Sequence, residues 1–256
     1  MSGALLSLRN VGWQAPVGAD ILQHVSLDVA PGEFVAIMGR NGAGKSTLLD
    51  IVAGLRAPSE GSVTIDGQPL DAWRLSERAR VLAHLPQVLR GDLSIRAEAI
   101  VLMGRYPHAS RWFESEDDER IAHEAMVRCE CLEFRQRALS TLSGGERQRV
   151  YLAACLAQQA RLLLLDEPAT FLDVDQQLQC FSIVRGEADK GAACLAVTHD
   201  VNLALTFCTR LLVLAGRGIA RDLGAAEALD DPSWLRTFSS RLDLERGPSG
   251  SWVRYR

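Results

Sequence analysis

The residues with the clearest chemistry form a nine-residue stretch near the amino terminus, from Gly39 to Thr47. The stretch fits the pattern G-x-x-x-x-G-K-[ST], which holds the phosphates of a nucleotide. Glycines let the backbone N–H groups approach an anion and adopt positive φ angles. The pattern predicts that Lys45 reaches the β- and γ-phosphates and that the Ser46 hydroxyl binds Mg²⁺. The expected nucleotide contacts are Gly39, Asn41, Gly42, Ala43, Gly44, Lys45, Ser46 and Thr47.

The segments on either side of this loop suit the same role. Residues 33–38 form a short β-prone apolar run, and residues 47–53 have the pattern of a helix that ends at Gly54. A strand, a glycine turn and a helix together direct backbone N–H groups and a helix N-terminus at one anion. Of the 28 Lys and Arg residues, only Lys45 and Lys190 are Lys, and one of them occupies the motif position. The sequence therefore predicts binding of a nucleoside triphosphate.

Two adjacent acids follow a run of four leucines, residues 162–165. In a parallel sheet, ligands bind at the carboxyl ends of the strands, so Asp166 and Glu167 are expected to face the site of Lys45. Asp166 is predicted to hold Mg²⁺, through water, and Glu167 to polarise the attacking water as a general base. The alternative is a pair of acids at a solvated strand end, which the preceding leucines disfavour.

A second phosphate-binding pattern lies at residues 142–148, Leu-Ser-Gly-Gly-Glu-Arg-Gln. A Ser and two Gly at the start of a helix form another N-terminus that can hold an anion. A chain with two such helix ends raises the question of why a single ATP needs both.

Composition restricts the class of protein. With 256 residues, the chain is long enough for one large domain with an inserted subdomain. The net charge of −4 provides no basic field for nucleic acid, so no nucleic-acid partner is expected. No apolar run approaches the ~20 residues of a membrane span, and no signal-peptide pattern is evident. The six cysteines show no C-x-x-C spacing and are expected to be buried thiols in the reducing cytosol.

The remaining patterns indicate an α/β fold. Residues 5–11, 25–29 and 62–66 have strand patterns and predict an antiparallel sheet. Helical spacing dominates from about 88 to 160, where the acids at 115–119 are expected to form a capped, solvated helix start. Apolar runs at 162–165, 194–197 and 211–214 are typical of parallel strands buried on both faces. We expect one domain over residues 1–240 and a short tail over 241–256 with a turn and an edge strand.

These motifs together resemble the ATP-binding subunits of ABC transporters over nearly the whole chain. Residues 39–47 match the family's Walker A motif, 162–167 its Walker B motif and 142–148 its signature. Gln87 stands at the Q-loop position, residues 169–173 at the D-loop and His199 at the switch histidine. The resemblance implies a P-loop NTPase fold with a mostly parallel core sheet, an antiparallel β subdomain and an inserted α-helical subdomain.

The family mechanism implied by the resemblance is ATP hydrolysis in a head-to-tail homodimer. ATP on the Lys45 loop of one subunit would be covered by Ser143, Gly144 and Gly145 of the other, which explains the two phosphate-binding helix ends. His199 would contact the γ-phosphate, and Gln87 would sense Mg²⁺ and the attacking water. Asp173 of the D-loop would complete the nucleotide site.

Two positions depart from the family pattern. The D-loop reads Thr170-Phe171-Leu172-Asp173 in place of the commoner Ser-Ala-Leu-Asp. The aromatic residue assigned to adenine stacking is Trp13 in place of Tyr, and packing beneath the sheet is an alternative for this ring. Neither change removes a group that the chemistry requires.

A finer resemblance concerns the transported substrate. Residues 101–108, with Gly104-Arg105-Tyr106-Pro107-His108, look like the G-R-x-P-H segment of ATPases that serve iron-siderophore, haem and cobalamin importers. Residues 171–177 point the same way, although Tyr106-Pro107 could simply turn the chain. The resemblance implies polytopic membrane permease subunits, a solute-binding protein, and a peripheral position on the cytoplasmic face of the inner (plasma) membrane. The alternative is a soluble ABC ATPase of iron–sulfur cluster assembly.

Overall fold

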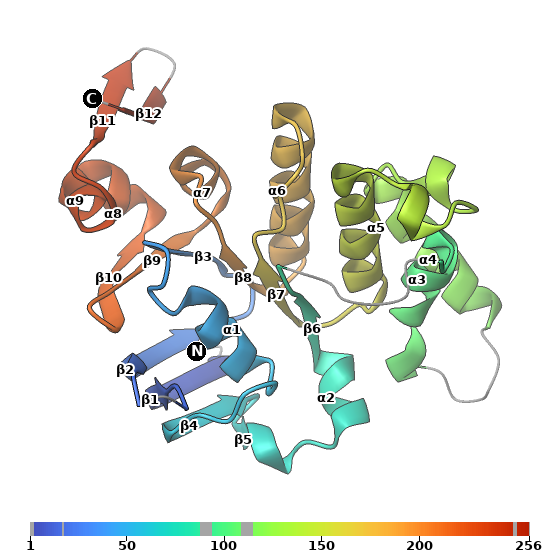
Figure 1. Cartoon of the computed structure of the whole chain (residues 1–256), viewed down its shortest axis with the longest axis horizontal. Coiled ribbons are helices and arrows are strands. Elements are labelled where there is room, and N and C mark those ends of the chain that lie inside the picture. Colours follow the sequence, from blue (N-terminus) through green and yellow to red (C-terminus); the bar gives the residue numbers. More distant parts are fainter. Residues whose placement is uncertain (1–2, 17, 88–93, 109–114, 248–249, 256) are drawn as a thin grey trace.

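The computed structural model describes residues 3–16, 18–87, 94–108, 115–247 and 250–255 (Figure 1). Two β-sheets share the centre of the molecule, and most of the helices surround them. A third, two-stranded sheet lies near the carboxyl terminus. Among the described residues, no helix combines the length and the apolar character needed to cross a membrane.

The smaller of the two central sheets is antiparallel, as predicted, with the order β2-β1-β4-β5. Along β1 the apolar residues Leu6 and Leu8 are buried and Arg9 is exposed, so one face of the sheet packs on the interior. The strand continues beyond the predicted end at Val11 and includes Trp13. The bounds are β1 Leu6–Gln14, β2 Asp20–Val29, β4 Glu60–Ile65 and β5 Gln68–Pro69.

The larger central sheet has the order β10-β9-β3-β8-β7-β6. All neighbours from β9 to β6 are parallel, and β10 is antiparallel to β9. Every residue of β3, β7 and β8 is buried, which confirms the predicted parallel core strands. The bounds are β3 Phe34–Gly39, β6 Leu82–Leu85, β7 Leu162–Asp166, β8 Ala193–Val197, β9 Arg210–Ala215 and β10 Gly218–Gly224.

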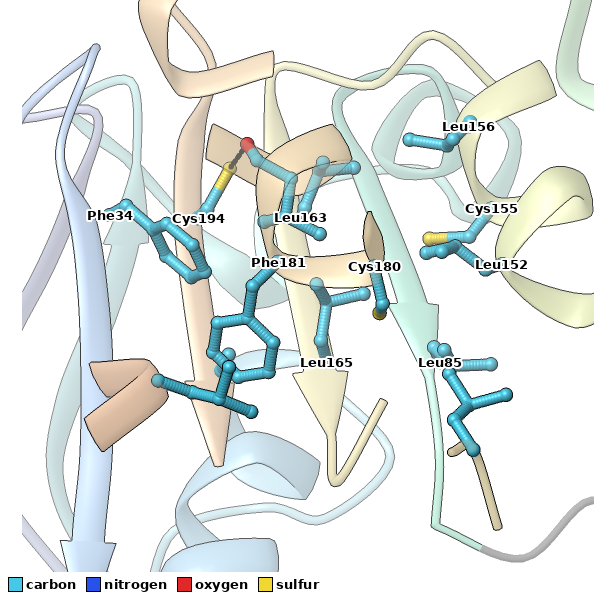
Figure 2. Packing of buried hydrophobic residues seen from close by; sticks show 14 of the residues in the cluster. Phe34, Leu85, Leu152, Cys155, Leu156, Leu163, Leu165, Cys180, Phe181 and Cys194 are labelled. Atoms are coloured by element: carbon cyan, nitrogen blue, oxygen red, sulfur yellow. Dashed lines mark hydrogen bonds between the residues drawn. The ribbon is translucent and has the colours of Figure 1, made fainter. Parts of the chain in front are cut away.

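Each face of the larger sheet has its own apolar core, because alternate residues of a strand point to opposite faces. From β3, Phe34 and Met38 enter the core beneath α6, where Phe34 lies 5.8 Å from Phe181 between ring centroids (Figure 2). Val35 and Ile37 enter the other core, which α1 and the antiparallel sheet cover. The flanking helices are α1 Lys45–Val52, α6 Val174–Asp189 and α7 Val201–Phe207.

Between β6 and β7 the described residues form helices that pack on one another, at the right of Figure 1. Ser115 caps α4 with a capping box, as the acidic start predicted. The expectation of a solvated start is wrong for Asp118, which is 7% exposed and lies 2.8 Å from the buried Arg105. The bounds are α3 Ala97–Met103, α4 Glu116–Arg128 and α5 Gly144–Ala157, with 3₁₀ helices η2 Tyr106–His108, η3 Leu132–Phe134 and η4 Leu139–Thr141.

The tail is a hairpin of β11 and β12, whereas the sequence predicted a single edge strand. It is anchored to the domain by the Asn202 side chain, which accepts from the N–H of Val253 at 2.7 Å and donates to its carbonyl at 3.2 Å. The remaining elements are η1 Leu70–Ala72, α2 Leu75–Val81, α8 Ala225–Asp230, η5 Pro232–Trp234, α9 Leu235–Phe238, β11 Leu242–Gly247 and β12 Gly250–Tyr255.

Candidate functional site

The parallel register brings the predicted site residues to one edge of the larger sheet. Leu85 of β6 pairs with Leu165 of β7, and Val197 of β8 pairs with both Asp166 and Ile37. The chain leaves each strand within two residues of these pairs. Gln87, Glu167, His199 and the loop that begins at Gly39 therefore follow neighbouring strand ends, which is where open α/β sheets bind ligands.

The glycines of the loop are required by its geometry. Gly39 has a φ of +148°, and a Cβ there would lie 2.5 Å from the carbonyl oxygen of Leu214 on β9. Gly44 has a φ of +92°, and its Cβ would lie 2.6 Å from the Leu22 side chain on β2. Side chains at these positions would both clash and strain the backbone. The loop is thus held tightly between the two central sheets.

Lys45 lies inside its own loop. Its ammonium group donates to the carbonyl oxygens of Gly39 at 2.9 Å and Arg40 at 3.1 Å, and the residue is 7% exposed. Burial lowers the pKa of Lys45, and the negative charges of Glu167 and Asp166 partly oppose that shift. The ammonium group is therefore placed where an anion in the loop would gain a strong partner.

Asp166 and Ser46 fit a divalent cation. Asp166 is 4% exposed, and within the described part of the chain its Oδ1 atom has no hydrogen-bond partner. Burial raises the pKa of Asp166, an effect that a hydrogen bond from the Ser46 hydroxyl reduces. The described residues contain no group of three or more His, Cys, Asp and Glu that could hold a metal. This donor set suits Mg²⁺, which uses one or two carboxylates together with phosphate oxygens and water.

Glu167 and His199 form a pair at the edge of this site. Oε1 of Glu167 lies 2.8 Å from Nε2 of His199, and Oε2 accepts from the Thr170 hydroxyl at 3.2 Å. The two side chains are 19% and 41% exposed, and both line a cavity of about 170 Å³. Glu167 has a positive φ of 53°, an uncommon conformation for a residue other than glycine. The carboxylate is thus held beside a space that water can enter.

The Ser-Gly-Gly motif begins α5. The Ser143 hydroxyl accepts from the N–H of Glu146 at 3.2 Å, and the Glu146 carboxylate accepts from the N–H of Ser143. The two glycines that follow permit close packing on the D-loop, since a Cβ on Gly145 would lie 2.8 Å from the carbonyl oxygen of Phe171. A Cβ on Gly144 would lie 3.2 Å from the Phe171 side chain. The signature helix and the D-loop therefore form one packed unit.

Two other predicted residues have structural contacts of their own. The Asp173 side chain caps α6 by accepting from the N–H of Gln176 at 2.9 Å. The Arg56 guanidinium covers one face of the Trp13 ring, 4.2 Å from its centroid, and the ring also packs on the core beside α1. Adenine could stack on this covered face only if Arg56 left the ring, and both uses of Trp13, adenine stacking and packing, stay predictions.

Sequence reasoning did not assign a role to Thr170 or Arg56. The hydrogen bond from Thr170 to Glu167 follows from the D-loop turn, and the departure of this loop from the family pattern was the only signal in the sequence. No sequence signal connected Arg56 to Trp13, which lies 43 positions earlier in the chain.

Comparison with known proteins defines the class. The family model of ABC transporters matches residues 22–170, which is more than half of the chain. The chain therefore belongs to the ABC transporter family, and it is an ATP-hydrolysing ABC ATPase.

Among curated relatives, the hemin import ATP-binding protein of Gloeobacter violaceus is 43% identical over 86% of this chain and 82% of its own length. The corresponding protein of Pseudomonas putida is 41% identical over 85% of this chain and 86% of its own length. The cobalamin import ATP-binding protein of Halobacterium salinarum is 38% identical over 91% of this chain and 58% of its own length.

Solved structures give the same class. A dimeric ATP-binding cassette in a post-hydrolysis state, bound to ADP and Pi, matches with a TM-score of 0.78 and 27% identity over 86% of this chain and 98% of that one. An ATP-binding subunit of an ABC transporter matches with a TM-score of 0.76 and 25% identity over 86% of this chain and 90% of that one. The fold predicted from the sequence is confirmed.

Proposed function

We propose that this chain powers an importer of haem or a related chelate, such as an iron-siderophore complex or cobalamin, through separate membrane permease subunits. The observation that carries the proposal is the 43% identity, over 86% of this chain, to a protein named for hemin import. The 38% identity to a cobalamin import protein supports the same group of substrates. Both relatives are named as ATP-binding proteins of import, which favours this function over iron–sulfur cluster assembly.

The residues at the sheet edge would bind and cleave ATP in distinct roles. Lys45, which now donates to carbonyl oxygens of its own loop, would turn to the β- and γ-phosphates. Ser46, Asp166 and Gln87 would hold Mg²⁺, which supplies charge neutralisation at the phosphates when bound. Glu167 would orient the attacking water and accept its proton. His199, paired with Glu167 at 2.8 Å, would contact the γ-phosphate and hold the carboxylate in place.

A homodimer would complete each site. Ser143, Gly144 and Gly145 at the start of α5 would cover the phosphates bound in a second copy, and Asp173 would contribute from the D-loop. The dimeric cassette bound to ADP and Pi supports this arrangement. ATP would stabilise the closed dimer, and hydrolysis would remove the phosphate that joins the two halves. We place the dimer on the cytoplasmic face of the inner membrane, beneath the permease, with a solute-binding protein on the opposite side.

Reconstitution tests the proposal directly. The chain is co-expressed with a polytopic permease that copurifies with it, the complex is inserted into proteoliposomes, and ATP-dependent uptake is measured for haem, a ferric siderophore and cobalamin. We expect uptake of one of these, and loss of uptake in the Glu167→Gln complex, which serves as the assembled but inactive control. The proposal fails if the chain binds no polytopic permease and its ATP hydrolysis responds only to a soluble scaffold of cluster assembly.

A further inference from the structure

A second cavity lies away from the catalytic edge and is lined by the turn after α1 and by residues of β4, β5, η1 and α2. Its volume is about 390 Å³, within the range of roughly 300–1,000 Å³ that is typical of small-molecule sites. Val63, Pro69 and Leu70 contribute to a largely apolar wall. None of the predicted nucleotide residues lines this cavity.

The cavity also carries an excess of positive charge. Two of its lining residues, Arg56 and Arg78, are cationic, and one, Asp71, is acidic and exposed. In the described part of the chain the Arg78 guanidinium has no hydrogen-bond or ion-pair partner. It lies against Gly54, where a Cβ would stand 2.2 Å from one of its terminal nitrogens. The glycine therefore makes room for a guanidinium that no carboxylate of the described chain neutralises.

The hydrogen-bond donors of the Arg56 side chain are only partly paired. One terminal nitrogen lies 3.4 Å from Asp50, a long distance for an ion pair, and the plane of the group rests on Trp13. Its Nε atom is buried and has no hydrogen-bond partner among the described residues. A buried donor without an acceptor costs free energy, so the contacts within the described chain leave part of the hydrogen-bonding capacity of Arg56 unused.

We propose that this cavity binds a small amphipathic anion, with an aromatic or aliphatic body on the apolar wall and a carboxylate, sulfonate or phosphate between Arg56 and Arg78. Planar guanidinium groups bind such anions through bidentate hydrogen bonds, and these bonds are strongest where the surroundings are apolar. The cavity is separate from the phosphate-binding loop, because Lys45 stands at the other end of α1, about 12 Å along the helix axis.

A purely structural role is the competing explanation for these arginines. Arg56 and Arg78 lie near the carboxyl end of α1, where positive side chains stabilise the partial negative charge of the helix. In that case, neutralising Arg78 would lower the melting temperature and leave anion binding unchanged. The two explanations therefore predict opposite results for the same variant.

The test uses the full chain and 8-anilinonaphthalene-1-sulfonate, an aromatic sulfonate whose fluorescence rises on binding. N-phenyl-1-naphthylamine, the same ring system without the sulfonate, is the uncharged control. We expect Arg78→Gln to weaken binding of the sulfonate by about tenfold, the loss of one charge-assisted hydrogen bond, and to leave the uncharged control unaffected. Arg74→Gln, at the exposed N-cap position just before the same helix and outside the cavity, is the matched control and should bind normally.

Two further measurements locate the bound sulfonate. Energy transfer from tryptophan should fall in Trp13→Phe, because Trp13 contacts the cavity residue Arg56, and should persist in Trp252→Phe, in the tail hairpin. Saturating ATP should not displace the sulfonate. The proposal is overturned if Arg78→Gln and Arg74→Gln bind it equally, if transfer is independent of Trp13, or if ATP competes with it. ATP hydrolysis by Arg78→Gln reports that the variant is folded.

Discussion

Replacing Arg105 tests the role of the most deeply buried ion pair among the described residues. Arg105 and Asp118 have side-chain exposures of 8% and 10%, and their closest atoms are 2.8 Å apart. The same guanidinium donates to the carbonyl oxygen of Ala157 at 2.7 Å and to Gln159 at 2.9 Å. It therefore ties the end of α3 to the start of α4 and the end of α5.

The expected cost of Arg105→Met follows from this burial. Removing one partner of a buried pair leaves an uncompensated charge, which costs about 3–5 kcal/mol. For a chain of this size each kcal/mol lowers the melting temperature by about 2–4 °C, so we expect a decrease of about 6–20 °C. Thermal unfolding of the nucleotide-free protein at neutral pH, followed by circular dichroism, provides the measurement.

The control lies on α4, the helix that carries Asp118. Arg120 pairs with Asp117 and Glu124, but all three side chains are at least 57% exposed, so Arg120→Met should lower the melting temperature far less than Arg105→Met. Adding Asp118→Asn to Arg105→Met should recover part of the lost stability, because it removes the unpaired charge. Equal melting temperatures for Arg105→Met and Arg120→Met would refute the reasoning.

The remaining predictions concern the catalytic edge and the thiols. Glu167→Gln should bind ATP but accumulate as an ATP-dependent dimer, because the base is missing; gel filtration with ATP would contradict this by showing only monomer. Lys45→Ala should lose ATP affinity in equilibrium titration, because the phosphates lose their ammonium partner, and unchanged affinity would exclude the assigned contact. Burial raises the pKa of Asp166 above its usual value of 3.8. Ionisation of this carboxyl therefore lowers the stability of the folded protein as the pH rises from 3.8 to the raised pKa. Asp166→Asn should therefore raise the melting temperature of the nucleotide-free protein at neutral pH, and the gain should vanish near pH 4; a constant gain would argue against this cause. Burial raises the pKa of Cys155 to about 12, so iodoacetamide should label this thiol only after unfolding, as mass spectrometry can show.

In the segment Gly104 to His108, the sequence pattern identified a motif, and the structure shows which of its side chains are buried and which is exposed. The sequence resemblance associated the whole segment with importer ATPases. In the structure Arg105 is buried and His108 contacts the carbonyl oxygen of Gln158 at 2.8 Å, whereas Tyr106 is 76% exposed. Arg105 and His108 thus stabilise the turn through contacts with the rest of the domain, and Tyr106 is the side chain that is exposed to a partner.

Local patterns were sufficient for much of the fold. The loop at Gly39, the four leucines before Asp166 and the capped start of α4 each involve neighbours in the chain, whose spacing determines their conformation. Local patterns could not predict β6, a strand of only four residues, or the pairing of β11 with β12, because short strands are stabilised by the strands they pair with.

By itself, the sequence determined the chemistry of this protein: a phosphate loop with Lys45, two acids after a buried strand, and a second helix start able to meet phosphate. The tertiary structure alone decided which groups are partners. The contact of Glu167 with His199, the exclusion of water from Asp118, and the placement of Arg56 on Trp13 all join residues from separate elements. Such contacts depend on strand register and helix packing, which no local spacing encodes.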